Sequence, residues 1–195
     1  MLEASCSLHP LNETVINECK PFTCGNNDLD DFFKNDAENY AKQLIGKSYC
    51  FRLETDLSTI ICAFTLSNSK IKVKGLDKKR KIVKNIPHRK SLEGYPAVLI
   101  GRLGINIEHQ RQGVGDELLD FIKSWFANST NKTGCRFIIV DALNEDGVLR
   151  FYIKNGFDFI FRDDDEEKKH NGIKIEGFLR TKSMYYDLLE MKVGN

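Results

Sequence analysis

Apolar residues recur along this chain at two different spacings, and each spacing predicts its own kind of element. Helical spacing predicts helices over residues 27–46, 114–126 and 144–154. Asn27 is typical of an N-cap, because acidic residues follow it in the first turn, where the helix dipole favours them. Asn155-Gly156 is typical of a left-handed helix end, so the third helix should stop there.

Short, continuous apolar runs predict strands instead. Residues 60–64 are apolar throughout, as expected for a central strand covered on both faces. Strands alternate with helices, and the early strands form hairpin-like pairs, so we predict an α/β (α+β) domain with a mixed sheet. The expected strands cover residues 14–19, 48–54, 58–67, 95–106, 137–140, 157–161 and 183–189.

Two charged stretches interrupt this pattern. Residues 70–90 carry eight lysines and two arginines against one aspartate, a local charge of +9. We interpret residues 70–94 as a solvated basic insertion, either a hairpin or partly disordered, because its few apolar residues would not form a core alone. The alternative is a surface that binds RNA phosphates without reading the sequence, since no aromatic residues are interleaved. The acidic run at 163–167 predicts a solvated loop rather than a metal site.

Composition adds limits rather than a function. With 195 residues, 41% of them hydrophobic, the chain can bury one sizeable core, so we predict a single domain over residues 1–195. A net charge of +1 commits the protein to neither nucleic acid nor membrane. The six cysteines have no C-x-x-C spacing, which favours free thiols, and the sequence has neither a signal peptide nor a membrane-spanning run. We therefore expect a cytoplasmic protein.

The chemistry is concentrated where a predicted strand meets a predicted helix, at Gln110-Arg-Gln-Gly-Val-Gly115. Glycines leave backbone N–H groups uncovered at the positive end of a helix, which suits a pyrophosphate, and Arg111 can add charge at the rim. The simpler alternative is that the two glycines only allow a tight helix entry. Leu118 stands where a dinucleotide fingerprint needs glycine, and no Lys-Ser or Lys-Thr follows, which disfavours Rossmann and Walker loops.

This segment resembles the Q/R-x-x-G-x-G/A signature of the GNAT acetyltransferase superfamily. A second block resembles the family's later motif: Asp141-Ala-Leu-Asn144, followed by Phe151-Tyr-Ile-Lys-Asn-Gly-Phe157. The two blocks occur in the family's order. The resemblance implies the GNAT fold, with a mostly antiparallel central sheet that is splayed at the cofactor site and flanked by helices.

The chain also resembles one subgroup, the GNAT-type toxins that acetylate aminoacyl-tRNA. The matching segments are residues 22–33, Gly101-Arg102-Leu103 and residues 181–188. The resemblance therefore covers nearly the whole chain apart from the basic insertion. Gly104 and Asn106 stand where these toxins usually carry Ala and Asp.

The resemblance implies acetyl-CoA as cosubstrate, no metal, and direct transfer of the acetyl group to a primary amine. The acceptor stays open between a small metabolite, a protein amine and the α-amine of aminoacyl-tRNA. Tyr152 is the implied general acid for the departing thiolate, and the N–H of Ile105 is the implied oxyanion donor. The implied cofactor-binding residues are Leu103, Gly104, Ile105, Gln110, Arg111, Gln112, Gly113, Val114, Gly115, Asp116, Asn144 and Phe151.

Simpler interpretations stay open for several residues. Tyr152 could be a packing residue and Asn144 only a helix cap. The group that takes the proton of the amine stays open between Glu108, His109, Glu145 and water. The alternative for the whole chain is a non-catalytic acyl-CoA-binding or RNA-binding module, although the intact loop and Tyr152 favour an enzyme. Candidate partners are tRNA, an antitoxin and a second copy of the chain.

Overall fold

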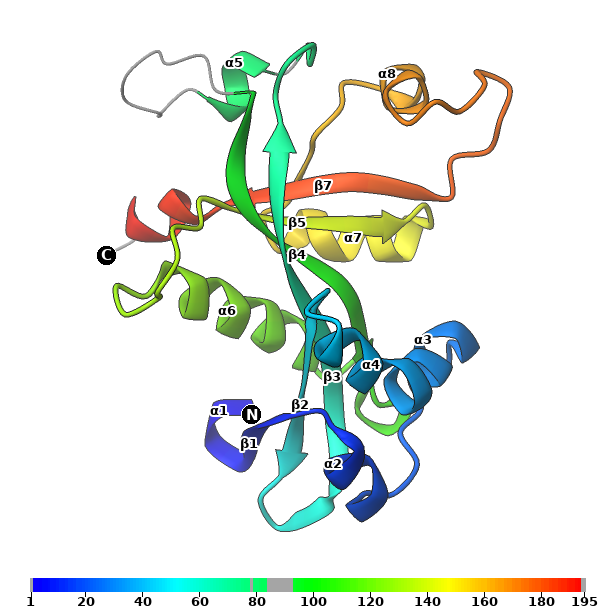
Figure 1. The fold of residues 1–195 in the computed structure, drawn as a ribbon, viewed down its shortest axis with the longest axis vertical. Helices are drawn as coiled ribbons and strands as arrows, with labels where there is room; N and C mark the ends of the chain where they lie inside the picture. Colours follow the sequence, from blue (N-terminus) through cyan, green and yellow to red (C-terminus); the bar gives the residue numbers. More distant parts are fainter. Residues whose placement is uncertain (1, 78, 84–92, 194–195) are drawn as a thin grey trace. The chain divides into compact units, whose positions relative to one another are not determined.

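A computed structural model describes residues 2–77, 79–83 and 93–193, and the chain divides into two compact units (Figure 1). The first unit comprises Met1–Asn68 with Ile100–Trp125, and the second comprises Ser69–Leu99 with Phe126–Asn195. Strands β3 (Asp56–Lys72) and β4 (Gly94–Ile105) contribute residues to both units. The prediction of one domain over the whole chain stays a prediction.

Seven strands form one sheet in the order β1-β2-β3-β4-β5-β7-β6. The pairs β1–β2, β2–β3, β5–β7 and β6–β7 are antiparallel. The predicted α/β class, with a mixed and mostly antiparallel sheet flanked by helices, is confirmed. The splaying of the sheet that the resemblance implies stays a prediction.

The first unit covers its strands with helices on both faces. In β2, alternate side chains point to opposite faces: Cys50 is buried among residues of α2 and η1, whereas Phe51 packs on Phe121 of α6, with ring centroids 5.0 Å apart. The elements are α1 (Leu2–Ser5), β1 (Cys6–Pro10), α2 (Glu13–Glu18), α3 (Asn27–Asp31), the π-helix η1 (Phe32–Asp36), α4 (Ala37–Lys42), β2 (Lys47–Leu53), the 3-10 helix η2 (Ile107–His109) and α6 (Val114–Ala127), which ends just beyond this unit.

The second unit has its own core, in which Phe137 of β5 packs on Tyr95 of β4 and Tyr185 of β7. Its further elements are α5 (Lys79–Ile82), β5 (Phe137–Leu143), α7 (Asp146–Lys154), β6 (Asp158–Phe159), α8 (Asp164–His170), β7 (Thr181–Asp187) and the 3-10 helix η3 (Leu188–Val193). Across the described part of both units, no helix is long and apolar enough to cross a membrane. All six cysteines are free thiols.

Most predicted elements are confirmed, but two are wrong. The strand predicted over residues 14–19 is the helix α2, because the Asn12 side chain accepts the N–H of Val15 at 3.0 Å and starts a helix there. The acidic run predicted as a loop is α8, which begins because Asp163 caps the N–H of Glu166 at 2.9 Å. Strand β1 was not predicted at all.

The first long helix begins one residue earlier than predicted. Asn26, not Asn27, is the N-cap, and its side chain accepts the N–H groups of Asp28 and Leu29. The helical path then passes through the π-helix η1 before α4 ends at Lys42. This π-helix carries Phe32 and Phe33, both buried.

The interpretation of residues 70–94 as a solvated insertion is wrong for its described apolar residues. Strand β3 continues to Lys72, and Ile71, Val73 and Ile82 are buried in the core of the second unit. The physical reason is the period-2 alternation of lysine with apolar residues over 70–74, which places one face of the chain in the core and the other in water. Lys70, Lys72, Lys74 and Lys81 are exposed, whereas Lys78, Lys84, Arg89 and Lys90 lie outside the described residues.

Candidate functional site

The end of β4 is anchored to the neighbouring strand by Asn106. Its backbone N–H donates to the carbonyl of Ile61 at 2.9 Å, and its side-chain amide donates to the carbonyl of Ile60, also at 2.9 Å. The Asn106 side-chain oxygen accepts the N–H of Glu108 at 3.1 Å, which turns the chain into η2. Leu103, Gly104 and Ile105, the predicted thioester-binding segment, are therefore held at a fixed strand end.

Gly104 leaves no room for a side chain on this strand. A Cβ atom at this position would lie 3.2 Å from the Cβ and Sγ of Cys24 and 3.2 Å from the ring of Phe33. Such distances are tighter than ordinary van der Waals contact, so the neighbours would have to move. The glycine thus allows the Cys24 segment and η1 to pack directly on β4.

The predicted pyrophosphate loop follows η2, and its glutamine side chains are used to build the loop itself. The Gln110 amide donates to the carbonyls of Cys24, at 2.8 Å, and Ile105, at 3.1 Å. The Gln112 amide donates to the carbonyl of Glu108 at 2.9 Å. These contacts tie the loop to the end of β4 and leave its backbone as the surface available to a ligand.

The loop backbone adopts the left-handed conformation twice. Gly113 has φ +84°, and Arg111, an exposed non-glycine residue, has φ +60°. Helix α6 then begins at Val114, and the N–H of Glu117 donates to the carbonyl of Gly113 at 3.1 Å. The N–H groups of Val114 and Gly115 precede this bond, so they have no acceptor within the helix. Free donors at the positive end of a 14-residue helix form an anion-binding arrangement.

The predicted catalytic tyrosine lies in the second unit, on α7. Tyr152 is 8% exposed, and its ring meets those of Phe151 and Phe157 edge-to-face, at centroid distances of 5.1 and 5.3 Å. Burial raises the pKa of Tyr152 to about 12, so the phenol is protonated at neutral pH. Its hydroxyl makes no hydrogen bond within the described parts of the chain.

Helix α7 ends two residues after this tyrosine, at Lys154. Gly156 has φ +81°, and its N–H donates to the carbonyl of Ile153 at 2.9 Å. The N–H of Phe157 donates to the backbone carbonyl of Tyr152 at 3.0 Å. These are the bonds of a glycine-terminated helix. The predicted left-handed terminus at Asn155-Gly156 is confirmed.

Asn144 does not cap α7. The N-cap is Glu145, which makes no side-chain capping bond, while the Asn144 amide donates to the carbonyl of Leu179 at 2.8 Å. The Asn144 N–H also donates to the carbonyl of Arg180, at 3.0 Å. Asn144 therefore holds the end of β5 to the segment that leads into β7, and the helix-cap alternative is wrong.

The candidate proton relays lie in different surroundings. Glu108 and Glu145 are both exposed to water. His109 is half-buried, and its Nδ1 is buried without a hydrogen-bond partner in the described part of the chain. No cluster of three or more metal-ligating side chains occurs among the described residues.

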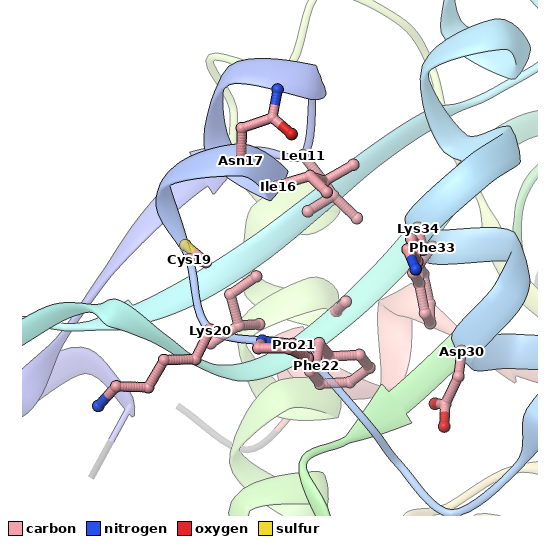
Figure 2. Close-up of a pocket in the computed structure, with 12 residues that line it drawn as sticks. Leu11, Ile16, Asn17, Cys19, Lys20, Pro21, Phe22, Asp30, Phe33 and Lys34 are labelled. Carbon is pink, nitrogen blue, oxygen red and sulfur yellow. The ribbon is translucent and has the colours of Figure 1, made fainter.

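Sequence reasoning missed a cavity in the first unit. It has a volume of about 290 Å³ and lies between the α2 segment and η1 (Figure 2). Its wall includes Phe33, whose ring would lie 3.2 Å from a Cβ atom at Gly104, and Lys20 and Lys34 are among the residues that line it. Asp30 is held there by the Thr23 hydroxyl at 2.6 Å and the Cys24 N–H at 2.8 Å. No local pattern predicts this cavity, because its residues come from stretches that are separate in the sequence, between Leu11 and Ala63.

The predicted catalytic and cofactor-binding residues thus lie in two groups. The first unit holds the end of β4 and the loop that leads into α6. The second unit holds Asn144, Phe151 and Tyr152. The residues of the first group are Leu103, Gly104, Ile105, Gln110, Arg111, Gln112, Gly113, Val114, Gly115 and Asp116.

Comparison with solved structures identifies the fold. A tyrosine-to-phenylalanine mutant of KacT matches with a TM-score of 0.73 and 19% identity, over 98% of this chain and 99% of that one. AtaT complexed with acetyl-methionyl-tRNAfMet matches with a TM-score of 0.72 and 20% identity, over 96% and 98%. AtaTR bound with AcCoA matches with a TM-score of 0.66 and 18% identity, over 97% of each chain.

No protein-family model matches this chain, and no curated protein matches it in sequence. The structural neighbours are GNAT-type toxin acetyltransferases. At identities of 18–20% the likeness establishes the fold and no more. The chain has the GNAT fold of these toxins, as the sequence resemblance predicted.

Proposed function

We propose that this chain is an acetyl-CoA-dependent N-acetyltransferase. The observation that carries the proposal is the loop at the start of α6. Arg111 and Gly113 are left-handed there, and the N–H groups of Val114 and Gly115 at the helix N-terminus have no acceptor within the helix. The loop matches the GNAT signature in sequence, and a structural neighbour of the same fold is bound with AcCoA. In the proposal, the loop binds the pyrophosphate of acetyl-CoA through the N–H groups of Gln112 to Asp116.

The reaction is a direct transfer. The acceptor amine attacks the thioester carbonyl carbon, a C–N bond forms, the C–S bond breaks, and CoA leaves as a thiolate. The N–H of Ile105 stabilises the oxyanion. The amine loses one proton, to water or to one of Glu108, His109 and Glu145, and the thiolate gains one.

Tyr152 is the proposed proton donor. A phenol with a pKa of about 12 is protonated at pH 7, so it can act as an acid and not as a base. Its hydroxyl makes no hydrogen bond within the described residues and is not one of the buried polar atoms without a partner, so it is available to the thiolate. Because a thiol has an ordinary pKa of about 8.5, the phenol stabilises the thiolate first by hydrogen bonding and gives up its proton late.

The proposed acceptor is the α-amine of aminoacyl-tRNA. This choice is supported by the resemblance of both chain ends to GNAT-type toxins and by a neighbour complexed with acetyl-methionyl-tRNAfMet. The exposed Lys70, Lys72 and Lys74 would contact RNA phosphates. An antitoxin is a further proposed partner, since AtaT is also known bound to the C-terminus of the antitoxin AtaR. Cytoplasmic location and a homodimer stay predictions.

The test measures the release of CoA from acetyl-CoA by detecting its free thiol. The acceptors are charged bulk tRNA, a mixture of amino acids and polyamines, or a protein lysate. Wild type should turn over charged tRNA, and Tyr152→Phe should be slower by about 10²–10⁴-fold, the usual contribution of a general acid. Tyr185→Phe is the matched control, because Tyr185 is also buried, with a pKa raised to about 12, but lies outside the proposed site.

Other outcomes separate the alternatives. Turnover of small amines alone would retain the enzyme and reject tRNA as acceptor. Acetyl-CoA binding in calorimetry without turnover of any pool would favour the non-catalytic acyl-CoA-binding module. Absence of acetyl-CoA binding would reject the proposal.

A further inference from the structure

Arg102 lies on β4 two residues before Gly104, so both residues point to the same face of the strand. On that face the Arg102 guanidinium carbon lies 4.1 Å above the centre of the Phe32 ring. Phe32 in turn meets Phe33 edge-to-face at 5.7 Å, and Phe33 forms a wall of the cavity in Figure 2. Arg102 therefore adjoins the aromatic pair that separates β4 from this cavity.

The charge of Arg102 has no counter-ion among the described residues. Its Nε is buried without a hydrogen-bond partner, and no carboxylate pairs with its guanidinium there. Two other arginines removed from water are paired: the buried Arg52 contacts Glu18 at 3.3 Å, and the half-buried Arg136 contacts Asp187 at 2.7 Å. The Nε of Arg136 also lacks a partner in the described residues, so the missing carboxylate is what distinguishes Arg102. A cation that is partly removed from water without a partner is unfavourable, and stacking on one ring offsets only part of that loss.

We infer that Arg102 is a specificity-determining residue that binds an oxyanion of the acceptor substrate. The inference rests on the proposed acetyltransferase function, because it assigns a role on the acceptor side of that reaction. The Phe32 ring fixes the plane of the Arg102 guanidinium. Of the guanidinium nitrogens, only Nε is a buried atom without a partner, so the two terminal nitrogens can reach a ligand. Such a fork binds phosphate or carboxylate through two parallel hydrogen bonds.

The charges of the adjacent cavity are nearly balanced, so the guanidinium itself sets the preference for an anion. Lys20, Lys34 and Asp30 line that cavity (Figure 2), and Lys20 is paired with Asp56 at 2.7 Å. The oxyanion is a phosphate if the acceptor is aminoacyl-tRNA, and a carboxylate if it is a free amino acid. An amino-acid amide carries the same α-amine without either group, so these three acceptors distinguish the source.

The experiment compares wild type, Arg102→Gln, Arg102→Lys and Lys42→Gln at saturating acetyl-CoA. Lys42→Gln is the matched control, because it removes one exposed positive charge at the end of α4. For the oxyanion-bearing acceptor, Arg102→Gln should raise KM by about 10- to 100-fold with little change in kcat, the loss expected for a charge-assisted hydrogen-bonded pair. Arg102→Lys should recover part of that loss. Amide turnover and the KM for acetyl-CoA should not change.

Two results would overturn the inference: an equal loss with the amide, which would mark a structural role, or no change with any acceptor. A selective loss with charged tRNA assigns the phosphate, and one with free amino acids assigns the carboxylate. The affinity for charged tRNA, measured by fluorescence anisotropy without acetyl-CoA, tests this inference independently of the proposed function. If wild type transfers no acetyl group but binds charged tRNA more tightly than Arg102→Gln does, the anion site is retained and the proposed enzyme is rejected. Thermal unfolding checks that Arg102→Gln is folded. If Arg102→Gln does not fold, the KM values of Arg102→Lys for the three acceptors test the inference instead.

Discussion

The loop that leads into α6 and the helix α7 reach their proposed roles in opposite ways. The loop is exposed at Arg111, Gln112 and Gly113, and what it offers a ligand is backbone N–H groups held by two left-handed residues. Tyr152 on α7 is 8% exposed, and what it offers is one side-chain hydroxyl whose pKa burial has raised to about 12.

This difference indicates which changes each region tolerates. A site built from backbone is sensitive to φ and insensitive to most side-chain chemistry, because any residue with the right backbone supplies the same N–H. A site built from one buried side chain is sensitive to the removal of a single atom and to the polarity around it. The predictions below test these two dependences separately.

Among the effects on binding and stability, the largest is expected for Gly113→Val. At φ +84° a β-branched side chain is strained, so the loop should leave its left-handed conformation and lose its aligned N–H donors. We expect the Kd for acetyl-CoA, measured by calorimetry, to rise by about 10- to 100-fold. Gly101→Ala is the control, because a Cβ there meets nothing within 4 Å. Unchanged affinity in Gly113→Val would separate the loop backbone from acetyl-CoA binding.

A smaller effect is expected when the hydroxyl of Tyr152 is removed and stability is measured against pH. The unfolded phenol ionises near pH 10, whereas the folded one keeps its proton until about pH 12. The raised pKa therefore stabilises the fold below pH 10, and this contribution is lost as pH rises from about 10 to about 12, by up to about 1.4 kcal/mol per pH unit.

Urea unfolding at pH 8, 10 and 11 checks this dependence. Tyr152→Phe should match wild type at pH 8 to within about 1 kcal/mol, since no hydrogen bond is lost in the described residues. Its decline above pH 10 should be shallower than that of wild type. Tyr185→Phe should behave similarly, because burial also raises the pKa of Tyr185 to about 12. An identical alkaline decline in Tyr152→Phe and wild type would mean that the phenol is not buried.

The smallest effect is expected at Arg111, whose φ of +60° is unfavourable for a residue with a Cβ. Arg111→Gly and Arg111→Ala remove the same charge but differ in backbone preference, so Arg111→Gly should be more stable than Arg111→Ala by about 1 kcal/mol in urea unfolding. Both variants should weaken acetyl-CoA binding equally if only the charge of Arg111 acts on it. A weaker affinity in Arg111→Ala alone would mean that the backbone acts instead.

Local patterns were sufficient for much of the fold. The apolar runs predicted β4 and β5, and the glycines predicted the helix end at Gly156 and the turn at Gly113. They failed where the decisive partner is distant in sequence or the apolar signal is weak. The Gln110 amide donates to the carbonyl of Cys24, 86 residues away, and no spacing within the loop indicates that contact. Strand β1 was missed because its residues are mostly half-buried and only one of the five is fully buried.

What the sequence by itself determined is the order of strands and helices over most of the chain and the chemical groups available at the loop and at Tyr152. These follow from periodicity and from glycine, which are local properties of the backbone. Only the tertiary structure decided that Ile71 and Val73 are buried, that burial raises the pKa of Tyr152, and that Arg102 has a ring but no carboxylate beside it among the described residues. Burial and charge pairing depend on neighbours brought together through space, and a linear pattern carries no record of them.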